Sequence, residues 1–108
     1  MDYAKTLEHY DAAVALCDGI ERKGKSMPYT SDNGHMFSLI NKDGELGVRF
    51  SKEDQQRLME ELESGHLHSH GAVMRGYVKM PDSVVKDAKR LAEFIKLGHK
   101  YVMSLDPK

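Results

Sequence analysis

Three histidines at alternate positions, His66, His68 and His70, have the spacing in this chain that most directly suggests chemistry. Alternate residues of a β-strand point to one side, so three imidazoles in this pattern could share a Zn²⁺ or Ni²⁺ ion. Such a site usually also needs carboxylates that orient the ligands, and no Asp or Glu lies between Glu63 and Asp82. The alternative is an exposed, histidine-rich strand edge. We expect no metal and no other cofactor, and keep the three histidines as the alternative metal ligands.

Other reactive side chains do not assemble into a catalytic pattern. The single cysteine, Cys17, is in helical register with Tyr10 and Val14, and a thiol in such a position is usually buried and inert. The neighbours Glu60 and Glu61 point apart on a predicted helix, so they form no acid–base pair. Gly34, Gly44 and Gly47 lie at predicted turns or in a strand, and none of them is followed by the Lys-Ser or Lys-Thr of a phosphate-binding loop. The sequence therefore predicts no catalytic residues and a protein that is not an enzyme.

A stripe of basic residues runs along the predicted C-terminal helix, opposite its apolar side; its members are Lys86, Lys89, Arg90, Lys96 and Lys100. Asp87 and Glu93 interrupt the stripe, and neither an aromatic ladder nor a glycine-rich loop accompanies it. The chain as a whole has a net charge of −1, so it lacks the long-range attraction to phosphate that dominates nucleic-acid binding. A solvated helix face explains the stripe, and a nucleic-acid accessory role is the less favoured alternative.

Seven methionines are many for 108 residues. Methionine fills irregular gaps in a core and also lines adaptable binding surfaces, and core filling is the commoner role. If Met27 or Met36 is exposed beside Tyr29 and Phe37, these residues would form a groove for a protein partner.

The first half of the chain predicts a helix and a three-stranded meander. Apolar residues at alternating steps of three and four indicate a helix over residues 2–18, ending near Gly19. A short strand over residues 26–30 contains Pro28, which places it at a sheet edge or makes it irregular. The hairpin-type dipeptides Asn33-Gly34 and Asp43-Gly44 bracket the next strand.

The third strand, residues 45–50, shows which face of the sheet is buried. Leu46, Val48 and Phe50 alternate with Glu45, Gly47 and Arg49. Such alternation is typical of an antiparallel strand that is half-buried. We therefore expect one face of the sheet to be in water.

The second half predicts a helix, a hairpin and a long helix. The spacing of Ser51 and Asp54 resembles a capping box, and Gly65 offers a stop for the helix that starts there. Residues 66–70 and 72–79 form two short strands joined around Gly71. From Pro81 onward apolar residues recur at helical spacing, and Gly98 suggests that this last helix bends or breaks there.

Together these elements form one α+β domain over residues 1–108 in the order α-β-β-β-α-β-β-α, a two-layer fold with an antiparallel sheet and helices on one face. The length allows a single core. The start of the chain has no secretory signal pattern, and no segment reaches the roughly 18 apolar residues of a membrane span. With one cysteine and hence no internal disulfide, we expect a cytoplasmic protein.

Several segments of the chain resemble the N-terminal domain of the TfoX/Sxy family; they are Lys25 to Ser38 (KSMPYTSDNGHMFS), Leu46 to Arg49 (LGVR), Gly71 to Val78 (GAVMRGYV), Met80 to Asp82 (MPD) and Tyr101 to Leu105 (YVMSL). The resemblance covers the chain from about residue 20 onward. It implies a two-layer α/β fold that is similar to secretion chaperones. It also implies a role in regulating bacterial competence and transcription that depends on protein partners, without known catalysis.

The chain departs from the family pattern at two points. Full-length members carry a second, C-terminal domain resembling a helix-hairpin-helix module, so we expect a free-standing N-terminal domain here. The segment from His66 to His70 has no counterpart in the family pattern. The sequence therefore predicts a non-catalytic protein-interaction module that presents a sheet face or edge to a protein partner or to a second copy in a homodimer.

Overall fold

The fold is built on a five-stranded antiparallel sheet, and the computed structural model describes all 108 residues. The strands are β1 Tyr29–Asp32, β2 His35–Ile40, β3 Leu46–Arg49, β4 His66–Ser69 and β5 Ala72–Lys79, in the spatial order β1-β2-β3-β5-β4. The helices are α1 Tyr3–Val14, α2 Lys52–Glu61, α3 Asp82–Val85 and α4 Ala88–Met103. The predicted α+β class and antiparallel sheet are confirmed, and the strand order left open by the sequence is settled.

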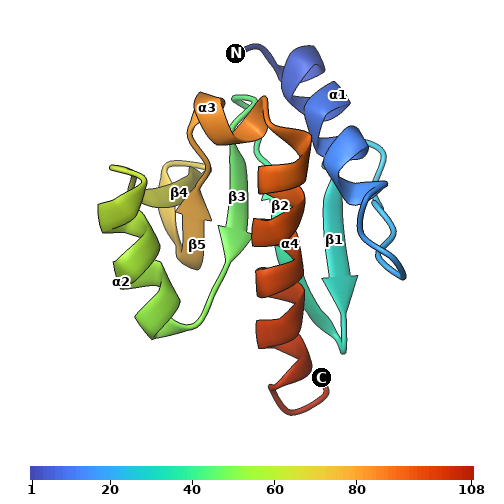
Figure 1. Cartoon of the computed structure of the whole chain (residues 1–108), viewed down its shortest axis with the longest axis vertical. Coiled ribbons are helices and arrows are strands. Elements are labelled where there is room, and N and C mark those ends of the chain that lie inside the picture. Colours follow the sequence, from blue (N-terminus) through green and yellow to red (C-terminus); the bar gives the residue numbers. More distant parts are fainter.

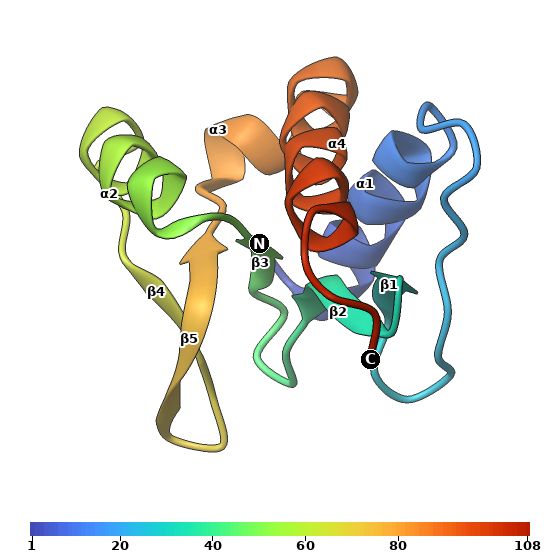
Figure 2. The ribbon, with the colours of Figure 1, turned by 90° about the horizontal axis from the view of Figure 1, so that it is seen from below.

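The helices all lie on one face of the sheet (Figures 1 and 2). α4 crosses β2 and β3, α1 packs beside α4, and α2 contacts β5. Between the layers lies a core of 18 buried residues, among them Tyr10, Phe50, Leu91 and Ile95. None of the four helices combines the length and the apolar character that crossing a lipid bilayer requires.

A β-bulge in β2 turns two successive side chains toward the helices. The pairing of β1 with β2 shifts after Thr30, which leaves Phe37 as the extra residue of β2. Phe37 lies against His99 of α4, with 5.3 Å between the ring centroids. The next side chain, Ser38, hydrogen bonds to Tyr10 of α1. Strand alternation is therefore interrupted in β2, beside edge strand β1.

The sheet face opposite the helices carries a second, smaller apolar cluster of Leu39, Leu67 and Tyr77, all buried. The β4–β5 hairpin bends away from the helix layer (Figure 2) and brings Leu67 across β3. A Cβ atom on Gly47 would lie 2.5 Å from Leu67 Cδ2. Gly76, with φ of 91°, marks the bend in β5. The prediction that this face lies in water is therefore wrong where the hairpin folds over it.

The predicted single C-terminal helix is two helices. α3 ends before Asp87, whose side chain then caps the start of α4 by accepting a hydrogen bond from the Arg90 backbone N at 3.2 Å. The break expected near Gly98 is wrong, because Gly98 lies inside an unbroken α4. A Cβ there would be 2.8 Å from both the backbone O of Arg49 and Cγ1 of Val48. Gly98 is therefore needed for the close approach of α4 to β3.

Two further boundaries differ from the prediction. α1 ends at Val14, four residues before the predicted end, and turns lead from there to Gly19. β1 begins at Tyr29, and ahead of it Lys23 forms an isolated bridge with that residue. The start of α2 agrees with the prediction, since Ser51 Oγ accepts a hydrogen bond from the Asp54 backbone N.

Candidate functional site

The three histidines of β4 and its turn do not converge on one point. The register of β4 against β5 shifts between His66 and His68, which disturbs the alternation that would place their rings side by side. His70 lies in the turn, with φ of 53°. The ring of His66 instead contacts the backbone O of Tyr77, 3.3 Å from Nδ1. No group of three or more His, Cys, Asp or Glu side chains in the chain could hold a metal ion.

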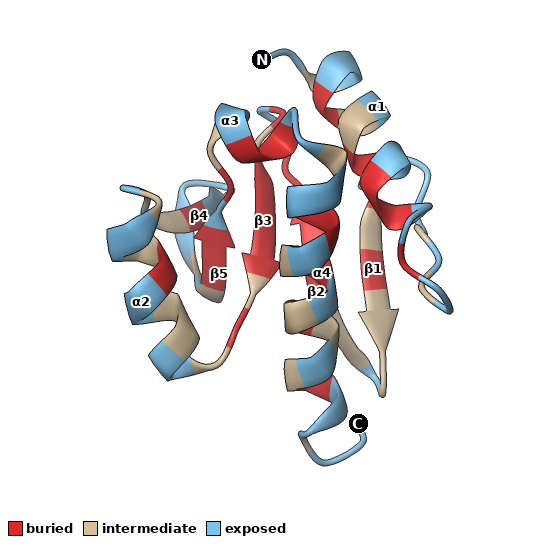
Figure 3. Cartoon of the chain, viewed as in Figure 1, coloured by how far each residue is buried: buried red, intermediate tan, exposed pale blue.

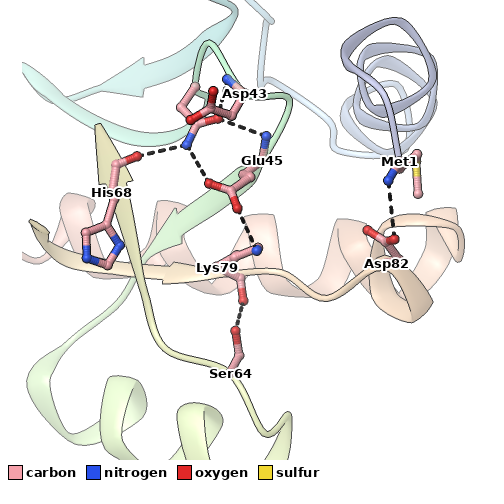
Figure 4. A network of polar contacts seen from close by, with 8 residues as sticks. Met1, Asp43, Glu45, Ser64, His68, Lys79 and Asp82 are labelled. Atoms are coloured by element: carbon pink, nitrogen blue, oxygen red, sulfur yellow. Dashed lines mark hydrogen bonds and ion pairs between the residues drawn. The ribbon is translucent and has the colours of Figure 1, made fainter. Parts of the chain in front are cut away.

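Beside these histidines, Asn41 connects the β2–β3 turn to the β4–β5 hairpin through hydrogen bonds to Glu45 and His68, which are labelled in Figure 4. Its Nδ2 donates to the backbone O of His68 at 2.8 Å and to Glu45 Oε1 at 2.9 Å. Its Oδ1 accepts from the backbone N of Asp43 at 3.0 Å and of Glu45 at 2.9 Å. Only 2% of Asn41 is exposed. Both polar atoms of the Asn41 side chain are thus paired: three of these hydrogen bonds order the turn, and the one to His68 holds the bent hairpin against it.

The same network extends to an ion pair between Glu45 and Lys79, whose carboxylate and ammonium are 2.6 Å apart. The hydrogen bond from Lys79, helped by the one from Asn41, lowers the pKa of Glu45. Ser64 donates to the backbone O of Lys79 at 2.5 Å. These contacts tie β5 to its neighbours, and their role is structural.

Cys17 is only 4% exposed, so the predicted burial of this thiol is confirmed. Its sulfur lies 3.4 Å from the backbone O of Ala13 and 3.7 Å from that of Ala92, which places it between α1 and α4. Burial raises the pKa of the Cys17 thiol. A neutral thiol held in this way is a packing group and a poor nucleophile.

Two buried tyrosines whose pKa values are raised, Tyr10 and Tyr77, are also engaged in packing. Tyr10 and Ser38 share a hydrogen bond of 2.5 Å in the core, and burial raises the pKa of Tyr10. Burial likewise raises the pKa of Tyr77 to about 12, and its hydroxyl donates to the backbone O of Met36 at 2.8 Å. Each phenol therefore uses its polar end to join separate elements of the fold.

The β1–β2 turn is fastened to the C-terminal end of α4. Asn33 Nδ2 donates to the backbone O of Val102 and of Leu105, both at 2.9 Å. Asp32 Oδ2 lies 2.8 Å from His99 Nε2, and this hydrogen bond is the main cause of the lowered pKa of Asp32. The Asn33 amide thus caps a helix end that would otherwise expose unpaired carbonyls, and the Asp32–His99 contact fastens the same turn to the side of α4.

The sheet offers a less open surface than the sequence suggests. Met27 is exposed and Met36 is partly buried, but the bulge turns Phe37 into the core, so the predicted groove of these residues with Tyr29 does not form. The outer hydrogen-bonding groups of Tyr29 in edge strand β1 are both taken by Lys23. In the other edge strand, β4, one carbonyl is taken by the Asn41 side chain. Both edges are therefore partly blocked.

α1 and α4 lie side by side in the helix layer, and both carry exposed residues on the side away from the sheet (Figure 3). We call this area the α1–α4 surface and define it by Glu8, Ala12, Ala15, Leu16, Asp18, Lys89, Glu93, Lys96 and Lys100. The spacings 8, 12, 15 and 89, 93, 96, 100 are those of one helix face. Between the two helices runs a shallow groove of about 640 Å³ that includes Leu16 and Ala92.

Charge is divided across the α1–α4 surface. The part on and just after α1 carries the carboxylates Glu8 and Asp18, and the exposed Lys5 and Asp11 of the same helix add one charge of each sign. The part on α4 carries three lysines and the carboxylate of Glu93, and Asp87 and Arg90, which also line the groove, add one charge of each sign. Leu16, 47% exposed, lies at the groove between them. The surface thus has an acidic side, an apolar strip and a basic side.

Only three residues of the predicted basic stripe belong to the α1–α4 surface; they are Lys89, Lys96 and Lys100. All five residues of the stripe are exposed, but Arg90 turns toward the ring of Phe94, 5.9 Å from its centroid, and Lys86 precedes the start of α4. Sequence reasoning missed the acidic and apolar side on α1. A usable signal was present, because Leu16 lies outside the apolar stripe that Tyr10, Val14 and Cys17 mark on that helix.

The fold and this surface define a small α+β protein with an open helix layer of divided charge. Comparison with models of protein families, with curated proteins and with solved structures finds no match for the chain. The likeness to the TfoX/Sxy domain and to secretion chaperones therefore stays a prediction.

Proposed function

We propose that the chain is a non-catalytic protein-interaction module that binds its partner through the α1–α4 surface. The observation that carries this proposal is the exposed Leu16 between an acidic and a basic row of side chains. An apolar strip flanked by charges gives a protein interface both its desolvated centre and its charged rim. The ionisable groups with shifted pKa values support a role without catalysis, since each makes contacts that hold the fold together; they are Tyr10, Cys17, Glu45 and Tyr77.

The divided charge favours a protein partner over a nucleic acid. Phosphate backbones attract lysines such as Lys89 and Lys96, but they are repelled by carboxylates on the same surface. Glu93 lies within the basic row itself, and Glu8 and Asp18 lie on the neighbouring side. A protein can offer both signs of charge in complementary places.

A regulatory role in bacterial competence and transcription belongs to this proposal as well. It comes from the resemblance of the segments from Lys25 onward to the TfoX/Sxy N-terminal domain. That resemblance implies action through protein partners, which agrees with a module whose accessible area suits protein binding. A cytoplasmic location is part of the same proposal.

Site-specific photo-crosslinking tests the proposed surface. Leu16 is replaced by the photoreactive residue p-benzoylphenylalanine in cells that make the protein, and Gln56, exposed on α2, carries the same group as the control. We expect a defined crosslinked product from position 16 and none from position 56. Equal products from both positions, or none from position 16, would remove the α1–α4 surface as the binding site.

A further inference from the structure

We infer that a second copy of this chain is the partner of the α1–α4 surface, an assignment that rests on the function proposed above. In a two-fold dimer each copy uses the same patch, so the patch must complement itself. With the axis along the apolar strip, the acidic side of one copy faces the basic side of the other. Such an arrangement pairs opposite charges twice and brings the two Leu16 side chains together.

The charges of the surface satisfy this condition. With Lys5 and Asp11 counted, the α1 side has a balance of two negative charges, and with Asp87 and Arg90 counted, the α4 side has a balance of two positive charges. Parallel stacking of like sides would place lysines against lysines. The two-fold arrangement is therefore the one that this charge pattern selects, and a strongly acidic or strongly basic foreign partner would match only half of it.

The size of the surface sets the strength to expect. Two helices about 10 Å wide lying side by side, the shorter about 18 Å long, present roughly 400 Å². A standard protein interface buries about 800 Å² on each partner. The dimer should therefore be reversible, with a dissociation constant of about 10 to 100 µM, and weakened by salt that screens its rim charges.

A charge exchange tests the inference in sedimentation equilibrium experiments on the full chain. One variant makes the basic side acidic, K89E with K96E, and the other makes the acidic side basic, E8K with D18K. Each variant alone should dimerise at least about tenfold more weakly than the wild type, because like sides now meet. An equimolar mixture of the two should dimerise again, because both pairs of opposite sides return.

The control variant carries K42E with K52E, the same change in net charge at exposed positions far from the surface in sequence. It should dimerise like the wild type. Circular dichroism should show all variants folded, since every substituted side chain is exposed. The wild type provides a test without substitution, because its dimerisation should weaken between about 50 and 500 mM NaCl.

Three results would overturn the inference. A wild type that remains monomeric at several hundred micromolar removes the second copy, and a Leu16 crosslink to a different protein would then leave the proposed function standing. Dimerisation that both variants leave unchanged would place the interface elsewhere. Retention on DNA at low salt that K89E with K96E abolishes would assign the lysines to nucleic acid.

Discussion

Replacing Gly47 by alanine is expected to displace the β4–β5 hairpin from the sheet. The added Cβ would lie 2.5 Å from Leu67 Cδ2 and 3.0 Å from Leu67 Cβ, and Leu67 is fully buried. Forcing a methyl group into such a contact costs about 1 to 3 kcal/mol. Because Leu67 is a flexible side chain, we expect a loss of about 2 kcal/mol in the free energy of unfolding. That loss corresponds to a fall of about 8 °C in Tm.

A double-mutant cycle separates this clash from other effects of the substitution. Leu67→Ala alone should cost about 2 to 5 kcal/mol by leaving a cavity in the second apolar cluster. In the Gly47→Ala background the same truncation also relieves the clash. The double variant should therefore lose less than the sum of the single losses, by about 1 to 2 kcal/mol.

Urea unfolding followed by circular dichroism measures these differences, and amide hydrogen exchange at residues 66–73 reports on the hairpin itself. Gly65→Ala is the matched control, because a Cβ there meets nothing within 4 Å and should change stability by less than about 1 kcal/mol. A Gly47→Ala variant as stable as the wild type, or strictly additive losses, would refute the account of the bent hairpin.

Four more outcomes follow from the contacts described above. Gly98→Ala should lower the free energy of unfolding by about 1 kcal/mol in thermal melts, since a clash of about 1 to 3 kcal/mol with β3 outweighs a helix-propensity gain of about 1 kcal/mol. Asn41→Ala should cost about 1 to 3 kcal/mol in urea unfolding by leaving buried polar groups unpaired; unchanged stability would contradict that assignment. Because the pKa of Glu45 is lowered, its stabilising contribution is complete above about pH 4.3 and is lost as pH falls through the lowered pKa, and Lys79→Met should flatten the acid side of a stability–pH profile. Untagged protein should carry no stoichiometric zinc by metal analysis, and His68→Ala should leave its metal content unchanged; stoichiometric zinc lost in this variant would restore the metal site.

Local patterns in the sequence determined most of the elements. The Asn33-Gly34 dipeptide marked the β1–β2 hairpin, where both residues have positive φ, and the alternation of residues 45–50 marked β3. Ser51 marked the start of α2 through its cap. These features involve residues close together in the chain, so their energetics are contained in the local sequence.

The candidate surface was only half visible in the sequence. The lysines of α4 could be predicted as an exposed row, because periodicity assigns the opposite side of that helix to the core. Nothing in the spacing within one helix states which helix lies next to it. The neighbouring acidic side of α1, and with it the divided charge around Leu16, follows only from the packing of the two helices.

The sequence alone thus determined most of the elements, the hairpin turns and the α+β class, but not the division of the C-terminal helix into α3 and α4. The tertiary structure decided the contacts that depend on a distant partner: Leu67 above Gly47, Gly98 against β3, and Asn41 holding the carbonyl of His68. It also separated the three histidines, because a bulge and a turn residue break the alternation on which their predicted convergence depended. Periodicity describes which side of an element is buried, whereas register shifts and close approaches are set by the elements that pack against it.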